Sequence, residues 1–171
     1  FNEMNAPTQN ESDILHTLCC AAEFSQIKVR EEEMEELENL LNQAPLTVRG
    51  GLSSKEGKTC VLMQAFIGGL PVRASALVSD CTFIAQSAAR IARGLFEIAL
   101  GRGWLSYAEK VLRVAKSLEQ RAWQFNHPLR QLNSLPYETY GKLEAKRASV
   151  QTLREMSAGE IGDLVNHQRL G

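Results

Sequence analysis

The chain has 171 residues, enough for one well-filled domain or for one domain with a small appendix. Hydrophobic residues make up 44% of it and charged residues 23%, which argues against a disordered or low-complexity protein. The net charge of -1 excludes a generic basic binder of nucleic acid or membrane, but the charge is unevenly divided. Residues 1–50 carry 10 acidic and 3 basic side chains, whereas residues 51–171 carry 10 acidic and 16 basic ones.

No apolar run is long enough to span a bilayer, and the first residues contain no signal-peptide core, so we expect no membrane partner. Because the chain begins at Phe1 and ends at Gly171, we expect a piece of a longer protein. The four cysteines have neither a zinc-site spacing nor that of a secreted disulfide framework, so we expect reduced thiols and no metal site. These cysteines are Cys19, Cys20, Cys60 and Cys81.

Helical patterns follow one another along the first 132 residues. Ser12 and Asp13 are expected to cap the first helix, and the second begins after Arg30 with an acidic run that we interpret as a solvated helix face. After a loop rich in Gly and Ser, Ser79 and Asp80 are expected to cap a new helix. The sequence thus predicts four further helices, at about 58–67, 72–79, 82–101 and 105–124.

The last residues have the pattern of a separate small unit with short helices and tight turns. Ser134 and Pro136 mark one helix start, and Ser157 with Glu160 matches a capping box. No segment alternates with the period of two that is typical of strands, so the predicted fold is all-α. We expect a helical bundle over residues 1–132, built around a long central helix at about 82–101, and a helix-loop-helix appendix over residues 133–171.

One segment, GLSSKEGKT at residues 51–59, is a near match to a phosphate-binding loop. Such a loop needs four residues between its first glycine and Gly-Lys-Ser/Thr, so that backbone N–H groups surround the phosphates, whereas five separate Gly51 from Gly57. It should also follow a buried parallel strand, and no sheet is predicted. We therefore interpret the segment as a Gly-rich entry to a helix. No constellation of catalytic side chains is present elsewhere, so we predict no catalytic residue and no cofactor in this chain.

The predicted helix 82–101 is apolar around most of its circumference, which is typical of the buried central helix of a bundle. One stripe is polar or small at a spacing of three or four residues: Gln86, Arg90, Arg93 with Gly94, Glu97 and Gly101. Because a buried guanidinium without a partner is costly, this stripe must face solvent, a partner charge or a ligand.

Two interpretations of the stripe remain open. In one, Arg93 forms an ion pair with Glu97 and Arg90 reaches the surface. In the other, the helix lines a groove for an anionic strand, with arginines on phosphates and Trp104 available to stack on a base. Residues 83–130 contain eight basic and three acidic side chains, which favours the second interpretation a little. Trp123 is expected to pack in the core.

Several segments together resemble the Sec-sixty-three homology domain of Ski-two-like, superfamily-two RNA helicases. They are FSQIKVREEE at 24–33, LMQAFI at 62–67, IAQSAARIAR at 84–93 with LFEI at 95–98, and PLRQ at 128–131. Within that family they look most similar to the first cassette of a helicase from a transcription-coactivator complex, and next to a spliceosomal helicase. The resemblance runs in order along nearly the whole chain.

The resemblance implies a helical bundle, a helix-loop-helix and then an immunoglobulin-like sandwich, of which this chain would contain the first two. It implies that the helix 82–101 is a ratchet helix that touches the translocating strand through Gln86, Arg90 and Arg93. The helix-loop-helix would guide the exiting strand through basic residues among Lys142, Lys146, Arg147 and Arg154.

The RecA-like motor domains of that family, which bind ATP and Mg, have no counterpart in this chain. The resemblance therefore implies that the chain alone is no enzyme and that the complete protein is an ATP-dependent RNA or DNA helicase. It implies single-stranded RNA or DNA, the motor domains, the neighbouring cassette and other complex subunits as partners, in the nucleus or the cytoplasm. The alternative from another class is a protein-interaction scaffold, and a small nucleotide-binding enzyme using residues 50–59 is the weakest reading.

Overall fold

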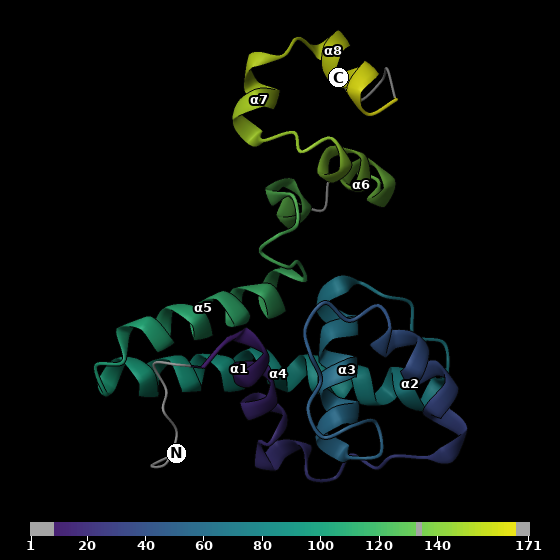
Figure 1. Ribbon diagram of the computed structural model, residues 1–171, viewed down its shortest axis with the longest axis vertical. Coiled ribbons are helices and arrows are strands. Elements are labelled where there is room, and N and C mark those ends of the chain that lie inside the picture. Colours follow the sequence, from purple (N-terminus) through teal and green to yellow (C-terminus); the bar gives the residue numbers. More distant parts are fainter. Residues whose placement is uncertain (1–8, 133–134, 167–171) are drawn as a thin grey trace. The chain divides into compact units, whose positions relative to one another are not determined.

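The computed structural model describes residues 9–132 and 135–166, and within them every regular element is a helix (Figure 1). The predicted all-α fold is confirmed. The chain divides into two compact units, residues 1–121 and residues 122–171, which are described separately. No helix of the described part has the length and apolar character needed to cross a membrane.

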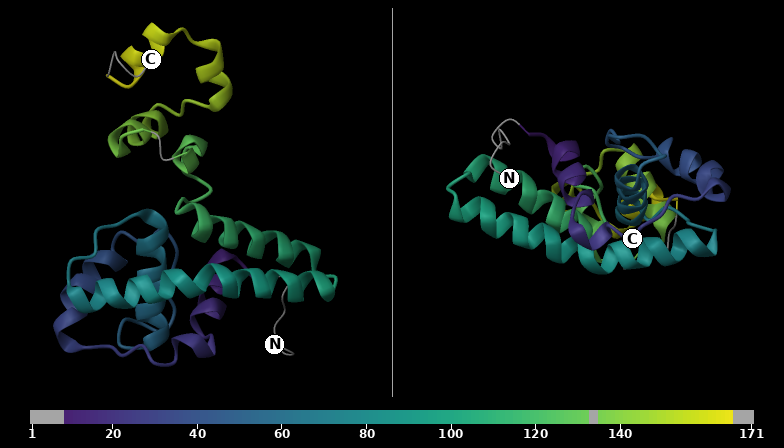
Figure 2. Two further views of the ribbon diagram at one scale, coloured as in Figure 1. Left: turned by 180° about the vertical axis from the view of Figure 1, so that it is seen from behind. Right: turned by 90° about the horizontal axis from the view of Figure 1, so that it is seen from below.

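The first unit contains five α-helices and two short 3-10 helices. The α-helices are α1 (Glu11–Cys19), α2 (Met34–Leu41), α3 (Lys55–Gly68), α4 (Ser75–Gly101) and α5 (Leu105–Gln120). The 3-10 helices, η2 (Ala22–Phe24) and η3 (Glu31–Glu33), lie between α1 and α2. Helix α4 packs against α1, α3 and α5, and runs beside α5 for much of its length (Figures 1 and 2).

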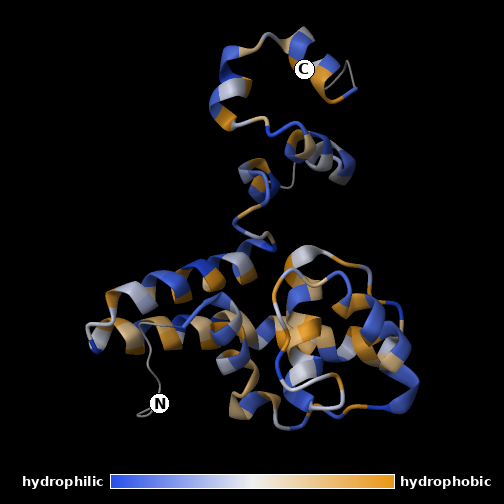
Figure 3. Ribbon diagram, in the orientation of Figure 1, coloured by the Kyte–Doolittle hydropathy of each residue, from blue (hydrophilic) through white to orange (hydrophobic). Residues whose placement is uncertain are grey.

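Helix α3 is the most completely buried element of this unit. Ten of its 14 residues are buried, and hydrophobic residues predominate along it (Figure 3). This surrounded position was predicted for the helix at 82–101, but α4 buries only one side. Val78, Phe83, Ile98 and Leu100 on α4 are exposed, because within this unit α1, α3 and α5 cover only part of its circumference.

Helix α4 is one continuous helix of 27 residues, about 40 Å long, where the sequence predicted two helices at 72–79 and 82–101. The expected cap at Ser79 and Asp80 is wrong. The Asp80 carboxylate lies 2.7 Å from the Lys58 ammonium, so it does not compete for backbone N–H groups. The helix starts instead where the Glu36 carboxylate accepts hydrogen bonds from the backbone N–H groups of Arg73, at 2.6 Å, and Ala74, at 3.0 Å.

Two other helix starts differ from the predictions. Asn10 caps α1, its side chain accepting from the N–H of Asp13, and the predicted Asp13 completes a capping box by accepting from the N–H of Asn10. Ser12 lies inside the helix and donates to the Thr47 carbonyl. Helix α3 begins at Lys55 because Ser54 caps it. A side chain at Gly57 would collide with the Gly51 carbonyl oxygen, 1.9 Å from an added Cβ, so glycine is required at this close approach.

The second unit contains the 3-10 helix η4 (Pro128–Leu132) and three short α-helices, α6 (Tyr137–Ala145), α7 (Val150–Glu155) and α8 (Ala158–Leu164). Its small core consists of Leu143, Ala148 and Val165, with Leu129, Leu153 and Leu164 packed against them. Ser157 and Glu160 form the predicted capping box of α8. Of the predicted helix start at Ser134 and Pro136, Ser134 lies outside the described residues, and Pro136 directly precedes the first residue of α6.

The division between the units falls after Arg121, earlier than the predicted boundary between 132 and 133. Side chains of the second unit hold residues 126–130. The Glu144 carboxylate accepts from the backbone N–H of His127 at 2.8 Å and from the Arg130 guanidinium at 2.7 and 2.9 Å. Trp123 is 7% exposed, as its expected packing role requires.

Candidate nucleic-acid interface

The polar stripe of α4 lies on the side opposite the buried stripe. Every member of the polar stripe except the half-buried Gly94 is exposed, and the buried residues recur at steps of three or four, as one face of a helix requires. These buried residues are Ile84, Ala88, Ala92, Leu95 and Ala99. The polar stripe of α4 therefore faces away from the core. Both interpretations of the stripe require this orientation.

Gln86, Arg90 and Arg93 line one surface hollow of about 880 Å³. The remaining lining residues are Ala89, Gly94 and Glu97 of α4 and Glu119 of α5. Three of the residues predicted to contact a strand are therefore brought together by successive turns of one helix. The hollow extends along several turns of α4 and is open to solvent.

The two arginines of the hollow are exposed, with 69% and 68% of the Arg90 and Arg93 side chains accessible. Arg93 forms an ion pair with Glu119 of α5, with 2.5 Å between Nε and Oε1. The expected pair between Arg93 and Glu97 is not the one that forms. The hydrogen bond and the charge of Glu119 raise the pKa of Arg93 above its ordinary value, so its positive charge is secure.

Arg90 lies between this hollow and a second one. Its guanidinium is 3.6 Å from the Glu23 carboxylate, which follows the end of α1. The second hollow, of about 600 Å³, lies between α4 and the segment from α1 to η2. Its lining is largely apolar and includes Leu18, Ala21, Ile91, Leu95 and Ile98.

Trp104 is not part of either hollow. It directly precedes α5, beyond the C-terminal end of α4, and is partly buried against the edge of Tyr107, 6.2 Å between ring centroids. The Arg102 guanidinium lies 5.1 Å from the centre of the Trp104 ring. One face of the indole is therefore occupied by a cation within the chain itself.

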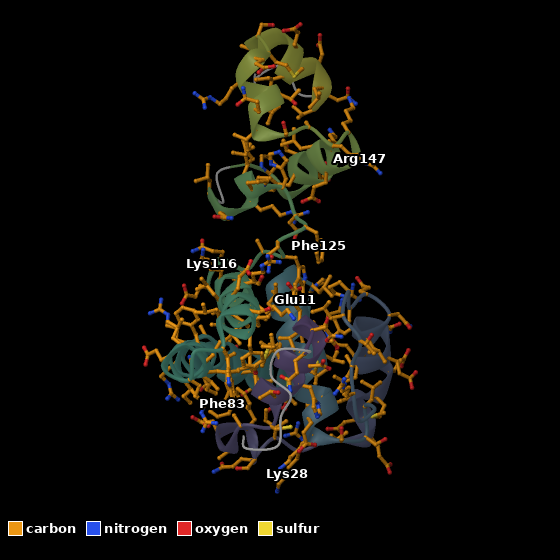
Figure 4. The ribbon with its side chains drawn as sticks, turned by 60° about the vertical axis from the view of Figure 1, so that its left-hand side comes forward. Glu11, Lys28, Phe83, Lys116, Phe125 and Arg147 are labelled. Carbon is orange, nitrogen blue, oxygen red and sulfur yellow. The ribbon has the colours of Figure 1, made fainter. Side chains whose placement is uncertain are left out.

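The four basic residues predicted in the second unit have two different environments. The ammonium groups of Lys142 and Lys146 donate to the carbonyls of Val165 and Leu164, each at 2.7 Å, and so close the C-terminal end of α8. Arg147, at the end of α6 (Figure 4), and Arg154 are exposed and form no ion pair within residues 9–132 and 135–166. Only these two are open to a ligand without loss of an existing contact.

Comparison with known proteins decides the family. The Sec63 Brl domain family matches residues 1–159. The chain belongs to this family. The resemblance seen in the four sequence segments is therefore confirmed.

Several large proteins match this Sec63 Brl domain over its whole length. Activating signal cointegrator 1 complex subunit 3 is 41% identical in Gallus gallus and 40% in Homo sapiens, over 172 residues in each case. The U5 small nuclear ribonucleoprotein 200 kDa helicase of Homo sapiens is 37% identical over 171 residues. The alignments cover 100% of this chain and 8% of each of these relatives.

The segment at 51–59 does not form a phosphate-binding loop in this structure. The candidate phosphate-binding residue of this segment is Lys58, but its side chain is 0% exposed. Its ammonium donates to the Glu33 carboxylate at 2.6 Å and to the Lys28 carbonyl at 2.7 Å. The Asp80 carboxylate lies 2.7 Å away. A lysine that is buried and has these three partners cannot reach a phosphate, so the loop at 51–59 is a structural entry to α3.

Sequence reasoning missed the acidic side chains that shape this domain. Glu33 was expected on a solvated helix face and instead binds Lys58. Glu36, expected on the same face, accepts from the backbone N–H groups of Arg73 and Ala74, directly before α4. Glu23 and Glu119 were not identified as partners of the hollow's arginines. A pattern within one helix cannot reveal them, because each lies on a different element from the arginine that it contacts.

Proposed function

We propose that this Sec63 Brl domain is an accessory domain of an ATP-dependent nucleic-acid helicase and contacts the translocating single strand, RNA in the first instance, through the outward stripe of α4. The observation that carries the proposal is that Gln86, Arg90 and Arg93 line one open hollow on the exposed side of α4. The opposite side of this long helix packs against neighbouring helices. One of the relatives named above, the U5 small nuclear ribonucleoprotein 200 kDa helicase, supports the same assignment.

In this mechanism the two guanidinium groups attract successive phosphates of the strand, and the Gln86 amide can donate to phosphate or base oxygens. The packing of α4 against α1, α3 and α5 keeps the spacing of these groups fixed. Because the arginines are exposed, each contact is weak and easily exchanged. Weak contacts at fixed spacing suit a strand that must be held in line and still advance.

The chemical work is assigned to other parts of the complete protein. RecA-like motor domains would bind ATP and Mg and drive the strand, and this domain would supply no catalytic residue. The second unit would guide the exiting strand through Arg147 and Arg154, with Lys142 and Lys146 contributing only if they leave α8. This chain resembles the domain in the first cassette of such a helicase. We expect the complete protein in the nucleus or the cytoplasm.

A second candidate function is a scaffold for the neighbouring cassette or for other subunits of a helicase complex. The observation that favours it is a set of exposed apolar side chains around the turn from α4 to α5. Ile98 and Leu100 are 47% and 46% exposed, and Leu105 is 71% exposed. Exposed apolar side chains at such a turn are available to a protein partner.

The strand-contact proposal is tested by unwinding assays on the complete protein with Arg90→Ala and Arg93→Ala combined. We expect slower ATP-driven unwinding and about tenfold weaker binding of a single strand, since two phosphate contacts are lost. The matched control is Arg113→Ala, because Arg113 is an exposed arginine of α5 that pairs with Glu109 of the same helix, and it does not line the hollow. Unwinding that equals that of the control would contradict the proposal.

A further inference from the structure

Each arginine of the α4 hollow has a carboxylate partner on a different element. Glu119 reaches Arg93 from α5, and Glu23 reaches Arg90 from η2. Glu119 also lines the hollow itself, whereas Glu23 lines the apolar hollow on the other side of Arg90. The positive groups of the stripe are therefore flanked by negative groups that the surrounding helices supply.

A guanidinium recognises carboxylate and phosphate with the same fork of N–H donors. A strand phosphate that contacts Arg93 must therefore displace Glu119 or accept a less favourable geometry beside it. The Glu119 side chain is 29% exposed and its contact is short, whereas the pair of Glu23 is longer, at 3.6 Å, and more open to solvent. Glu119 is the stronger of the two competitors.

We propose that Glu119, with Glu23 in a lesser part, is an internal competitor of the strand phosphates that lowers the affinity of the α4 stripe. Glu119 orders the Arg93 side chain when no phosphate is bound, and its ion pair with the guanidinium re-forms when a phosphate leaves. This inference rests on the proposed function. Glu119 acts through Arg93 and is therefore a positioning residue.

The variant Glu119→Gln keeps the size of the side chain and removes its charge. In the complete protein we expect it to bind a labelled single-stranded oligonucleotide about two- to fivefold more tightly, in keeping with the strength of exposed ion pairs. The dependence of log affinity on log salt should become steeper by up to about 0.7, because one more positive group then counts fully against phosphate.

The matched control is Glu109→Gln. Glu109 lies on the same helix and pairs with an arginine, Arg113, but neither residue lines the hollow. Glu109→Gln removes the same charge as Glu119→Gln, so it measures the general effect of lowering the negative charge of the domain. We expect its effect on affinity and on the salt slope to be clearly smaller than that of Glu119→Gln.

A double-mutant cycle with Arg93→Ala separates competition from simple repulsion. If Glu119 acts on Arg93, then Glu119→Gln gains little once Arg93 is absent. An equal gain with and without Arg93, a gain equal to that of Glu109→Gln, or no gain at all overturns the inference. If Arg90→Ala and Arg93→Ala leave affinity and salt slope unchanged, the proposed function fails, and this inference with it. If they weaken binding while Glu119→Gln changes nothing, only the inference fails.

Discussion

Two of the ion pairs that join α4 to neighbouring elements differ in burial. Near the start of α4, Asp80 lies 2.7 Å from Lys58 of α3, whose side chain is 0% exposed. In the middle of α4, Arg93 pairs with Glu119 of α5 and is 68% exposed. A buried cation that loses a partner leaves an uncompensated charge, whereas an exposed pair exchanges readily with water and ions. The first pair fixes α4, and the second leaves its cation available.

The sharpest way to break this comparison is Lys58→Met. We expect it to lower the free energy of unfolding by about 3–5 kcal/mol, because the buried Glu33 carboxylate then keeps only Arg30 as its cation. Denaturant unfolding measures the change. Lys55→Met, one turn earlier on α3 and 46% exposed, is the control and should change stability by less than about 0.5 kcal/mol. Equal effects of the two variants would show that the buried pair has no special role.

Acidification probes the same buried cluster. Burial alone would raise the pKa of Glu33, but hydrogen bonds and charge from Lys58 and Arg30 outweigh it and hold the pKa below its ordinary value of 4.5. A carboxyl with a lowered pKa contributes stability that is present above about pH 4.5 and is lost as the pH falls through the folded-state value. The free energy of unfolding should therefore decrease on acidification below pH 4.5.

Glu33→Gln checks the origin of that decrease. The variant should be less stable at neutral pH and should show a shallower decline of stability below pH 4.5. Glu31→Gln, exposed two residues earlier, should keep the steep decline of the unchanged protein. An unaltered decline in Glu33→Gln would assign the acid sensitivity to other carboxyl groups.

A half-buried carboxylate in the second unit should give an intermediate effect. Glu144 accepts from Arg130 and from the backbone of His127, and the hydrogen bonds from Arg130 lower its pKa. Glu144→Gln should cost about 1–2 kcal/mol, seen as faster hydrogen exchange in α6 and not in α3. Glu138→Gln, exposed on the same helix, is the control. Equal exchange in both variants would show that Glu144 does not hold this unit together.

The smallest effect on stability is expected for the exposed pair. Arg93→Ala should move the midpoint of denaturant unfolding no more than Arg113→Ala does, since both arginines are exposed and paired. A midpoint shift comparable with that of Lys58→Met would mean that Arg93 holds the fold. The distinction between a fixing pair and an available pair would then be lost.

Features set by nearby residues were predictable from the sequence. The helical class, the Ser157–Glu160 capping box and the outward position of the polar stripe all follow from spacings within a few residues. The same local logic placed Trp123 in a core.

Features that depend on distant partners were not predictable. Ser79 and Asp80 are residue types that often cap helices, so they were predicted to start one. The prediction failed because Asp80 pairs with Lys58, which lies on α3. One interpretation paired Arg93 with Glu97 four residues away, but Arg93 pairs with Glu119 of α5. The resemblance implied Lys142 and Lys146 among the possible strand contacts, and in the fold their ammonium groups donate to carbonyls at the end of α8. In each case a charged side chain is satisfied by a residue whose proximity only the tertiary fold creates.

The most direct test of the strand contact places a photoreactive benzoyl-phenylalanine on the outward stripe. Introduced at Gln86, in the hollow, it should cross-link a labelled single strand bound to the complete protein. Introduced at Asn39, exposed on α2 and outside the hollow, it should not. Cross-linking at Gln86 that is lost with Arg90→Ala and Arg93→Ala is the result expected. No cross-link at Gln86, or equal yields at both positions, would contradict the assignment of α4 as the strand-contacting helix.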